Sequence, residues 1–272
     1  MSNLYSNEGY FRCGIPYNRF GHGSSILVIF QGLLFENKPM AGFMAKKFFE
    51  MYNSIAEEYT IYIVNRKPGL PKGYSLQDMA DDYAEMIREE FGCPVDVLGI
   101  STGGSIVQHF AANHSDLVNK LIIHSSAYTL GDSAKKGQMH VRQLASERKW
   151  RAAYAELMGI SLPKGPSRHL MQPFYWFISL FGKSFFGMPD DPSDLVITIE
   201  AEDKHNFKDR LSEISAPTLV IAGDKDPFYS EKLFRETAEG ISNTKLIIYK
   251  GMGHPASGKQ FKRDLRNFLI ES

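Results

Sequence analysis

Short apolar runs alternate along the chain with segments of helical periodicity. The strand-like runs are Ser25–Phe30, Tyr59–Arg66, Val95–Ile100, Lys120–Ala127, Pro217–Asp224 and Thr244–Gly251. Between two of them, residues 76–87 carry apolar side chains at helical spacing, and Ser75 fits the N-cap of that helix. Apolar strands that alternate with amphipathic helices predict a mostly parallel sheet with helices on both faces.

The alternation stops between about Leu130 and Ile214. No strand-like run occurs there, and helical patches appear instead, separated by turn residues in "PKGPS" and "GMPDDPS". One patch is rich in aromatic residues: Phe174, Tyr175, Trp176, Phe177, Phe181, Phe185 and Phe186. The pattern predicts a helical insertion between the sixth and seventh strands of the sheet.

Composition narrows the class of protein. The chain has 272 residues, 43% of them hydrophobic, which is enough for one large globular core. It has 31 basic and 31 acidic residues, so no excess of positive charge favours nucleic acid or an anionic membrane as a partner. The two cysteines, Cys13 and Cys93, make neither a disulfide framework nor a zinc site.

The apolar segments favour a soluble cytoplasmic protein. The first residues, "MSNLYSNEGYF", lack the apolar stretch of a secretory signal. The most apolar run elsewhere, "FYWFISLFG", is far shorter than the roughly 20 residues that span a bilayer. We therefore expect no membrane span.

A single serine stands at the junction of a predicted strand and a predicted helix. Ser101 follows the strand Val95–Ile100 and precedes helical residues 105–112, with Gly99 and Gly103 two positions away on either side. A chain that turns this sharply leaves no space for larger side chains at those two positions. The turn would expose the serine oxygen, and the free N–H groups of the following helix would favour negative charge beside it. G-x-S-x-G in this context predicts a nucleophile.

A serine hydroxyl needs a base, and the base needs a group that orients it. His254 lies among glycines in "YKGMGHPASG", after the last predicted strand. Asp224 and Asp226 follow the preceding strand in "VIAGDKDPFYS". All three loops leave the carboxyl end of the sheet, where ligands bind in open parallel sheets. The order serine, aspartate, histidine is that of one fold, and not of the chymotrypsin or subtilisin arrangements.

Together these motifs resemble those of the α/β-hydrolases. "GISTGG" is similar to the nucleophile elbow of that family, "GDKDP" to its acid loop, "GMGH" to its histidine loop, and "VIFQG" to the His-Gly after its third strand. The resemblance covers nearly the whole chain. It implies a core of about eight strands formed by residues 1–129 and 215–272, with residues 130–214 as a helical cap.

The resemblance also implies roles for individual residues. Ser101 matches the nucleophile, Asp226 the acid and His254 the base, while Asp224 matches a variable position. The backbone N–H groups of Leu33 and Thr102 would form the oxyanion hole. One departure is Gln31-Gly32 in place of His-Gly, which leaves the subfamily and the placement of Leu33 open.

Other polar and aromatic residues are weaker candidates. Gln31 and the cap residues Trp176 and Phe177 are predicted to contact substrate, and His124 with Ser125 are candidates to line the pocket. His109 and His114, on the helix after Ser101, are interpreted as packing or surface residues. The acidic residues Glu200, Glu202 and Asp203 could hold a substrate amine, although a solvated helix face is the simpler interpretation.

The resulting hypothesis is a serine hydrolase that acts on a small or medium, fairly apolar carboxylic ester or related acyl compound, with no metal or organic cofactor. The same triad in relatives also cleaves carbon–carbon bonds, lactones, peptides or thioesters. A further alternative is a ligand sensor that binds in the pocket and signals to a partner protein. Neither the substrate nor the oligomeric state follows from the sequence.

Overall fold

The computed structural model describes residues 7–161 and 189–271. The elements before the insertion are β1 (Asn7–Tyr10), β2 (Pro16–Phe20), β3 (Ser25–Phe30), α1 (Gly42–Tyr52), η1 (Asn53–Ile55), β4 (Tyr59–Val64), α2 (Leu76–Glu90), β5 (Val95–Ile100), α3 (Thr102–Asn113), η2 (Ser115–Leu117) and β6 (Val118–His124). Those that follow are α4 (Asp132–Ser146), α5 (Trp150–Ile160), α8 (Ser193–Asp203), η3 (Lys208–Glu213), β7 (Thr218–Gly223), α9 (Glu231–Gly240), β8 (Thr244–Tyr249), α10 (Lys259–Arg266) and η4 (Asn267–Glu271).

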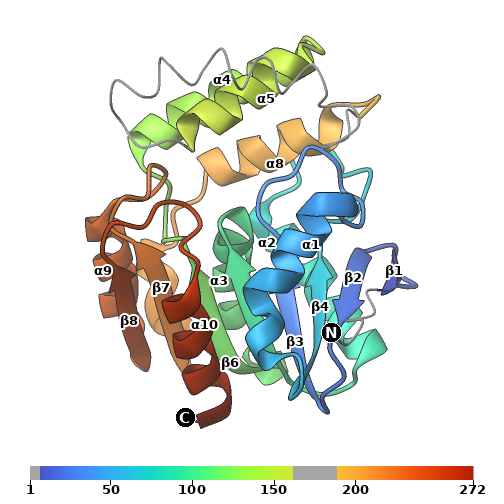
Figure 1. Ribbon diagram of the computed structural model, residues 1–272. Helices are drawn as coiled ribbons and strands as arrows, with labels where there is room; N and C mark the ends of the chain where they lie inside the picture. Colours follow the sequence, from blue (N-terminus) through green and yellow to red (C-terminus); the bar gives the residue numbers. More distant parts are fainter. Residues whose placement is uncertain (1–6, 162–188, 272) are drawn as a thin grey trace.

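One 8-stranded sheet forms the centre of the molecule, with the strand order β1-β2-β4-β3-β5-β6-β7-β8. β1 and β2 pair antiparallel with each other, and β2 pairs antiparallel with β4. All other neighbours are parallel. The predicted mostly parallel sheet is therefore confirmed, and the strand order places the carboxyl ends of β3, β5, β7 and β8 along one edge (Figure 1).

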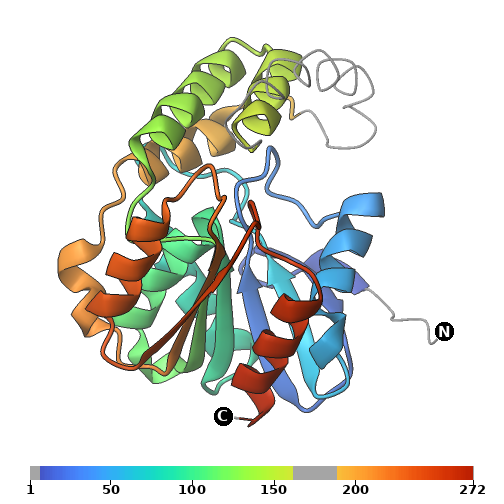
Figure 2. The ribbon, with the colours of Figure 1, turned by 60° about the vertical axis from the view of Figure 1, so that its left-hand side comes forward.

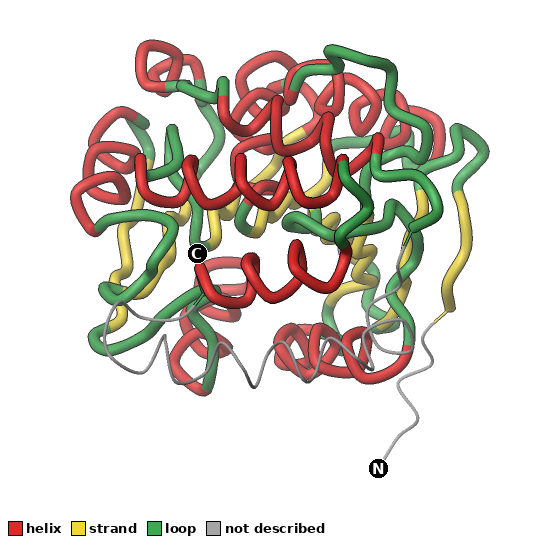
Figure 3. The backbone as a smooth tube through the Cα atoms, turned by 90° about the horizontal axis from the view of Figure 1, so that it is seen from above, coloured by secondary structure: helices red, strands yellow, loops and turns green. Residues whose placement is uncertain are grey.

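Successive side chains of each central strand enter two separate apolar layers. In β3, Val28 and Phe30 pack with α2 and α3 on one face, and Leu27 and Ile29 pack with α1 and α10 on the other. This alternation buries both faces of the sheet, as expected for parallel strands. Figure 3 shows the strands with helices on both sides.

Helices α4, α5 and α8 lie between β6 and β7 in the chain and above the carboxyl edge of the sheet in space (Figures 1 and 2). They fall inside the predicted segment 130–214. At the start of α8, the carboxylate of Asp194 accepts hydrogen bonds from the N–H groups of Gly69 (3.0 Å) and Leu70 (2.7 Å). These bonds attach α8 to the loop after β4. No helix in the described part of the chain has the length and apolarity that a membrane crossing requires.

The sequence located most elements but misplaced several ends. The helix after Ser101 begins at Thr102, earlier than the predicted Ser105. The predicted strand Lys120–Ala127 ends at His124, because Ser125 adopts a φ of 48°, which no strand residue does. The hairpin β1–β2 and helix α1 were not predicted, since β1 buries none of its residues and α1 buries few.

Candidate active site

Ser101 occupies a strained turn between β5 and α3. Its φ of 54° lies in the left-handed region, which non-glycine residues rarely adopt. A Cβ atom added to Gly103 would lie 1.9 Å from the carbonyl oxygen of Phe30, and one added to Gly99 would lie 2.3 Å from that of Gly103. The steric reason predicted for the two glycines is thus confirmed: the turn brings backbone to where side chains would be.

Three distant loops bring a carboxylate, an imidazole and a hydroxyl into hydrogen-bonded series. His254 Nε2 lies 3.0 Å from Ser101 Oγ, and His254 Nδ1 lies 2.7 Å from Asp226 Oδ2. The Asp226 side chain is 0% exposed and the His254 side chain 9%. The other carboxylate oxygen of Asp226 accepts the N–H groups of Phe228 (2.9 Å) and Tyr229 (3.2 Å). These bonds orient the carboxylate toward the imidazole.

The rival carboxylate Asp224 has a different partner. Its Oδ1 accepts the N–H of Gly251 at 2.6 Å, at the start of the loop that carries His254. Asp224 therefore braces the backbone of that loop, and the geometry selects Asp226 as the partner of the imidazole.

The loop after β8 is held by two residues at the end of β6. His124 Nε2 donates to the carbonyl of Ala256 at 2.6 Å, and Ser125 Oγ accepts the N–H of Ala256 at 3.0 Å. Both side chains belong to residues that are 0% exposed. Burial lowers the pKa of His124 to about 4, so its ring is a neutral donor. The expectation that these residues line a pocket was wrong, because both are buried against the backbone of the histidine loop.

The loop after β3 lies on the other side of Ser101. A Cβ added to Gly32 would lie 3.2 Å from the Ser101 Cβ, so this backbone packs directly on the serine. Neither the Leu33 nor the Thr102 N–H donates a hydrogen bond to another described residue. Both are therefore free to bind an incoming oxygen. The Gln31 side chain, predicted to contact substrate, is buried and donates to Met40 Sδ at 3.2 Å.

Arg66 belongs to the site, although its place in the sequence pattern did not predict this. Its Nη1 donates to the carbonyls of Gln31 (3.2 Å) and Gly32 (3.1 Å) in the loop beside Ser101. The available signal was a basic residue at the carboxyl end of a predicted buried strand, on the edge of the sheet that carries Ser101.

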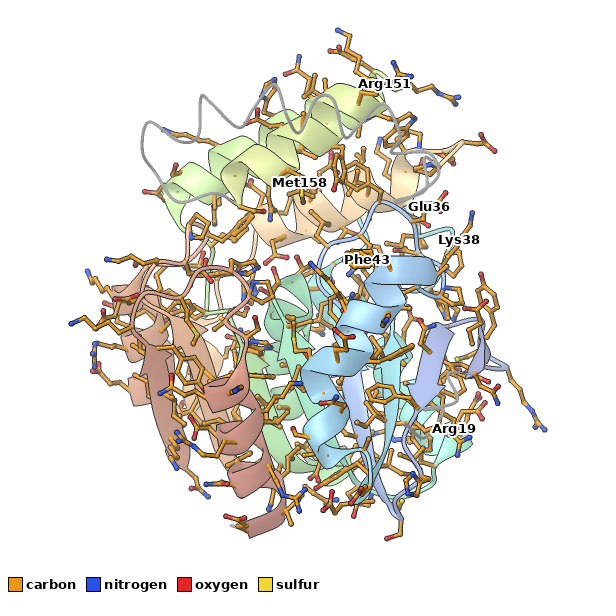
Figure 4. The ribbon with its side chains drawn as sticks, in the orientation of Figure 1. Arg19, Glu36, Lys38, Phe43, Arg151 and Met158 are labelled. Carbon is orange, nitrogen blue, oxygen red and sulfur yellow. The ribbon has the colours of Figure 1, made fainter. Side chains whose placement is uncertain are left out.

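The surroundings of the site are mainly apolar. The Phe228 ring centroid lies 4.6 Å from that of His254. Phe35, in the loop after β3, contacts Tyr154 (5.8 Å) and Trp150 (6.2 Å) of α5 by ring centroids. The predicted contact residues Trp176 and Phe177 lie outside the described residues. In Figure 4, exposed Phe43 lies at the upper end of α1, and Met158 lies on α5 above the sheet edge.

Glu202 does not lie on a solvated helix face, as the simpler interpretation had it. The residue is 0% exposed, and its carboxylate contacts the first turn of α3. Its Oε1 accepts the hydroxyl of Ser105 at 2.7 Å, and the hydroxyl of Tyr229 lies 3.4 Å from the same oxygen. Burial raises the pKa of this carboxyl. Glu200 instead forms an ion pair with Arg142.

The two histidines of α3 have structural surroundings. The His109 ring packs on Phe207 at 4.7 Å between centroids, and His114 Nε2 lies 2.7 Å from Asp81. Both match the packing and surface interpretations. Over residues 7–161 and 189–271, no cluster of three or more His, Cys, Asp or Glu side chains could hold a metal ion.

Comparisons with known proteins agree with this architecture. The model of the alpha/beta hydrolase fold family matches residues 64–258. "Putative carbamate hydrolase RutD" of Serratia proteamaculans (strain 568) is 23% identical over 241 residues, which cover 81% of this chain and 84% of that protein.

Two solved structures share the fold along nearly the whole chain. MGS-M2, an α/β-hydrolase enzyme from a Medee basin deep-sea metagenome library, has a TM-score of 0.78 at 16% identity and covers 95% of this chain and 94% of its own. The enol-lactonase of Burkholderia xenovorans LB400 has a TM-score of 0.72 at 14% identity, over 94% and 96%.

Proposed function

Because this chain belongs to the α/β-hydrolase fold family, we propose that it is a serine hydrolase of small or medium, fairly apolar carboxylic esters or related acyl compounds. The observation that carries the proposal is the series Asp226–His254–Ser101, with contacts of 2.7 Å and 3.0 Å. These distances lie within the reach required of a nucleophile, its base and the group that orients the base.

The first half of the reaction forms an acyl-enzyme. Ser101 Oγ attacks the substrate carbonyl carbon while His254 Nε2 accepts the hydroxyl proton. Asp226 accepts the Nδ1–H of the same ring, which keeps Nε2 free as a base and stabilises the imidazolium. His254 then returns the proton to the leaving alcohol. In the second half, water attacks the acyl-enzyme carbonyl while His254 accepts a proton from it. His254 then returns this proton to Ser101 Oγ as the bond to the acyl group breaks and the acid leaves.

The oxyanion of each tetrahedral intermediate would bind the N–H groups of Leu33 and Thr102. The free state of both donors and the packing of Gly32 on Ser101 support this assignment. Thr102 begins α3, so the positive end of that helix faces the same oxygen. Losing one such donor typically costs about 3 kcal/mol of transition-state stabilisation.

The substrate class is proposed from the surroundings of the triad. Leu33, Phe35, Tyr154 and Phe228 belong to one apolar cluster that joins the loop after β3 to α5. Such walls favour apolar acyl or alcohol groups over charged ones. The relatives named as a carbamate hydrolase and an enol-lactonase add carbamates and lactones to the panel of substrates worth testing.

The proposal is tested by Ser101→Ala. We expect turnover of p-nitrophenyl butyrate to fall by about 10⁴-fold or more, because the nucleophile is gone. Ser146→Ala, which removes an exposed serine hydroxyl of α4, is the matched control and should retain full activity. A fluorophosphonate probe followed by mass spectrometry should label Ser101 in the wild-type chain. Unchanged turnover in Ser101→Ala would refute the mechanism, and tight ligand binding without turnover in the wild type would identify a sensor.

A further inference from the structure

Arg66 lies directly behind the loop that packs on Ser101. It is the second residue after β4, and it is 1% exposed. A single nitrogen, Nη1, donates to both the Gln31 and the Gly32 carbonyl, at 3.2 Å and 3.1 Å. Within the described residues no carboxylate forms an ion pair with this guanidinium, so its nearest partners are the two loop carbonyls.

The Gly32 carbonyl belongs to the same peptide group as the Leu33 N–H. A trans peptide is planar, and its C=O and N–H point in opposite directions. Fixing the oxygen against Arg66 therefore also fixes the direction of the N–H. A cationic donor on the oxygen polarises the peptide and strengthens the N–H as a donor, since hydrogen bonds in a chain reinforce one another.

The same peptide group lies against the nucleophile. A Cβ atom added to Gly32 would lie 3.2 Å from the Cβ and 3.8 Å from the Oγ of Ser101. The Leu33 N–H has no other acceptor among the described residues. An acceptor that appears beside Ser101 Oγ during acyl transfer is therefore within reach of a donor that Arg66 orients.

We propose that Arg66 is a positioning residue for the oxyanion hole: it holds and polarises the Gly32–Leu33 peptide, so that the Leu33 N–H binds the tetrahedral intermediate more strongly than the substrate. This inference rests on the proposed serine hydrolase function. It also accounts for the absence of the His-Gly pair, because the loop of this chain is fixed through its backbone carbonyls and not through the side chain that precedes Gly32.

The buried charge is costly unless negative charge appears near it. Arg66 Nε and Nη2 have no hydrogen-bond partner among the described residues. Burial lowers the pKa of this guanidinium from its ordinary value, while the more distant Glu202 and Asp194 act in the opposite direction. A guanidinium nevertheless stays protonated in proteins. An oxyanion that forms on the far side of the Gly32–Leu33 peptide supplies part of the compensation that the ground state lacks.

The test compares Arg66→Met, Arg66→Gln and Arg66→Lys with the wild type. We expect kcat for p-nitrophenyl butyrate to fall about 100-fold in Arg66→Met, with KM within about threefold, because a transition-state contact is lost. The affinity for an alkyl boronic acid, which forms a tetrahedral adduct with Ser101, should fall in parallel. Arg66→Lys should recover about tenfold of the loss, since an ammonium can still donate to one carbonyl.

Arg266→Met is the matched control. Arg266, the last residue of α10, also donates to a backbone carbonyl, that of Ser54 at 2.9 Å. It pairs with Glu58, which precedes β4 at the end of the sheet opposite to Ser101. This variant should keep wild-type kcat and boronate affinity. Circular dichroism and thermal unfolding of all variants separate a folding defect from a catalytic one. If Arg66→Met does not fold, Arg66→Gln decides, with an expected loss of about 30-fold in kcat and boronate affinity.

Two outcomes would overturn the inference. The first is a folded neutral variant with wild-type kcat and boronate affinity, in a chain whose turnover depends on Ser101; the proposed function would then stand while the role of Arg66 fails. The second is a loss of kcat matched by an equal rise in KM, with no recovery in Arg66→Lys, as a purely structural role predicts. Turnover that survives Ser101→Ala would refute both proposals together.

Discussion

The loops after β3 and after β8 reach Ser101 from opposite sides of β5, and they are held by opposite kinds of group. The β3 loop is fixed by the buried cation of Arg66 through two carbonyls. The β8 loop is fixed by the neutral side chains of His124 and Ser125 and by the carboxylate of Asp224. The anion Asp226 contacts the imidazole that this loop carries. Acyl transfer would create an oxyanion beside the β3 loop, where the buried charge of Arg66 is positive. It would create an imidazolium on the β8 loop, where the buried charge of Asp226 is negative.

This difference has a physical reason. A tetrahedral intermediate carries negative charge toward the β3 loop and leaves a positive imidazolium on the β8 loop. A cation behind His254 would disfavour the imidazolium, and an anion behind Leu33 would disfavour the oxyanion. The low pKa of His124, about 4, keeps a second positive charge away from His254 at neutral pH. The residues that hold the two loops therefore differ in charge as the proposed reaction requires, and not only in shape.

The largest effect is expected when the negative charge of Asp226 is removed from the β8 side of the site. We expect Asp226→Asn to lower kcat by about 10³- to 10⁴-fold, because an amide no longer favours the imidazolium or the useful tautomer. The Asn oxygen can still accept the N–H groups of Phe228 and Tyr229, so the fold should be retained. Steady-state kinetics with p-nitrophenyl butyrate measures the effect.

Asp224→Asn is the control for that experiment. It carries the same chemical change two residues away, in a carboxylate that binds the Gly251 N–H. Its loss of kcat should stay below about tenfold, because the backbone contact survives in the amide. Equal losses in the two variants would contradict the selection of Asp226.

A second prediction concerns His124, the neutral histidine that holds the β8 loop. Burial lowers the pKa of His124 from its ordinary 6.5 to about 4, with a smaller lowering by His254 and opposing effects of Ala256 and Asp226. Between these two pH values the unfolded chain binds a proton that the folded chain does not. The free energy of unfolding therefore falls as pH is lowered through this window, by up to about 1.4 kcal/mol per pH unit for this histidine.

His124→Gln should remove that contribution and so reduce the slope of stability against pH, measured by urea unfolding at pH 7, 6 and 5. His109 and His205, whose pKa values burial also lowers, keep their own contributions to the slope. The glutamine amide can still donate toward the Ala256 carbonyl. His140→Gln, at a residue of α4 whose side chain is 53% exposed, is the matched control with which the slope of His124→Gln is compared. An unaltered slope in His124→Gln would show that His124 takes up its proton in the folded chain as readily as in the unfolded one.

The smallest effect is expected at Gln31. Its side chain contacts Met40 Sδ, and its Oε1 is buried without a hydrogen-bond partner in the described structure. Since Arg66 holds the loop through backbone carbonyls, Gln31→Met should change kcat and KM by less than about threefold. Loss of the unsatisfied oxygen should raise the free energy of unfolding by about 1 kcal/mol. A large loss of kcat would show instead that the side chain positions the loop.

The sequence predicted the fold and the proximity of Ser101, His254 and Asp226 because those features follow local rules. Strand and helix periodicity, the glycines around Ser101 and the positions of Asp226 and His254 after their strands are all visible in short segments. The choice between Asp224 and Asp226 rested on resemblance alone, and only the distances to His254 and Gly251 distinguish the two.

The supports could not be predicted in the same way. Arg66 and Gly32 are far apart in the chain, and a basic residue after a strand is usually exposed. Glu202 looked like part of a charged helix end, yet it is 0% exposed and accepts the hydroxyl of Ser105 in α3. Such contacts depend on how separate elements dock, which no local pattern of residues records.

The end of β6 has a mechanical consequence for the site. The Ser101 N–H donates to the carbonyl of His124 at 3.0 Å, while the side chains of His124 and Ser125 grip both polar groups of Ala256. Ser101 and the loop that carries His254 are thus both hydrogen-bonded to the end of β6. When thermal motion displaces the end of β6, we expect Ser101 and His254 to be displaced together. The distance between Ser101 Oγ and His254 Nε2, over which a proton would be transferred, should therefore stay nearly constant.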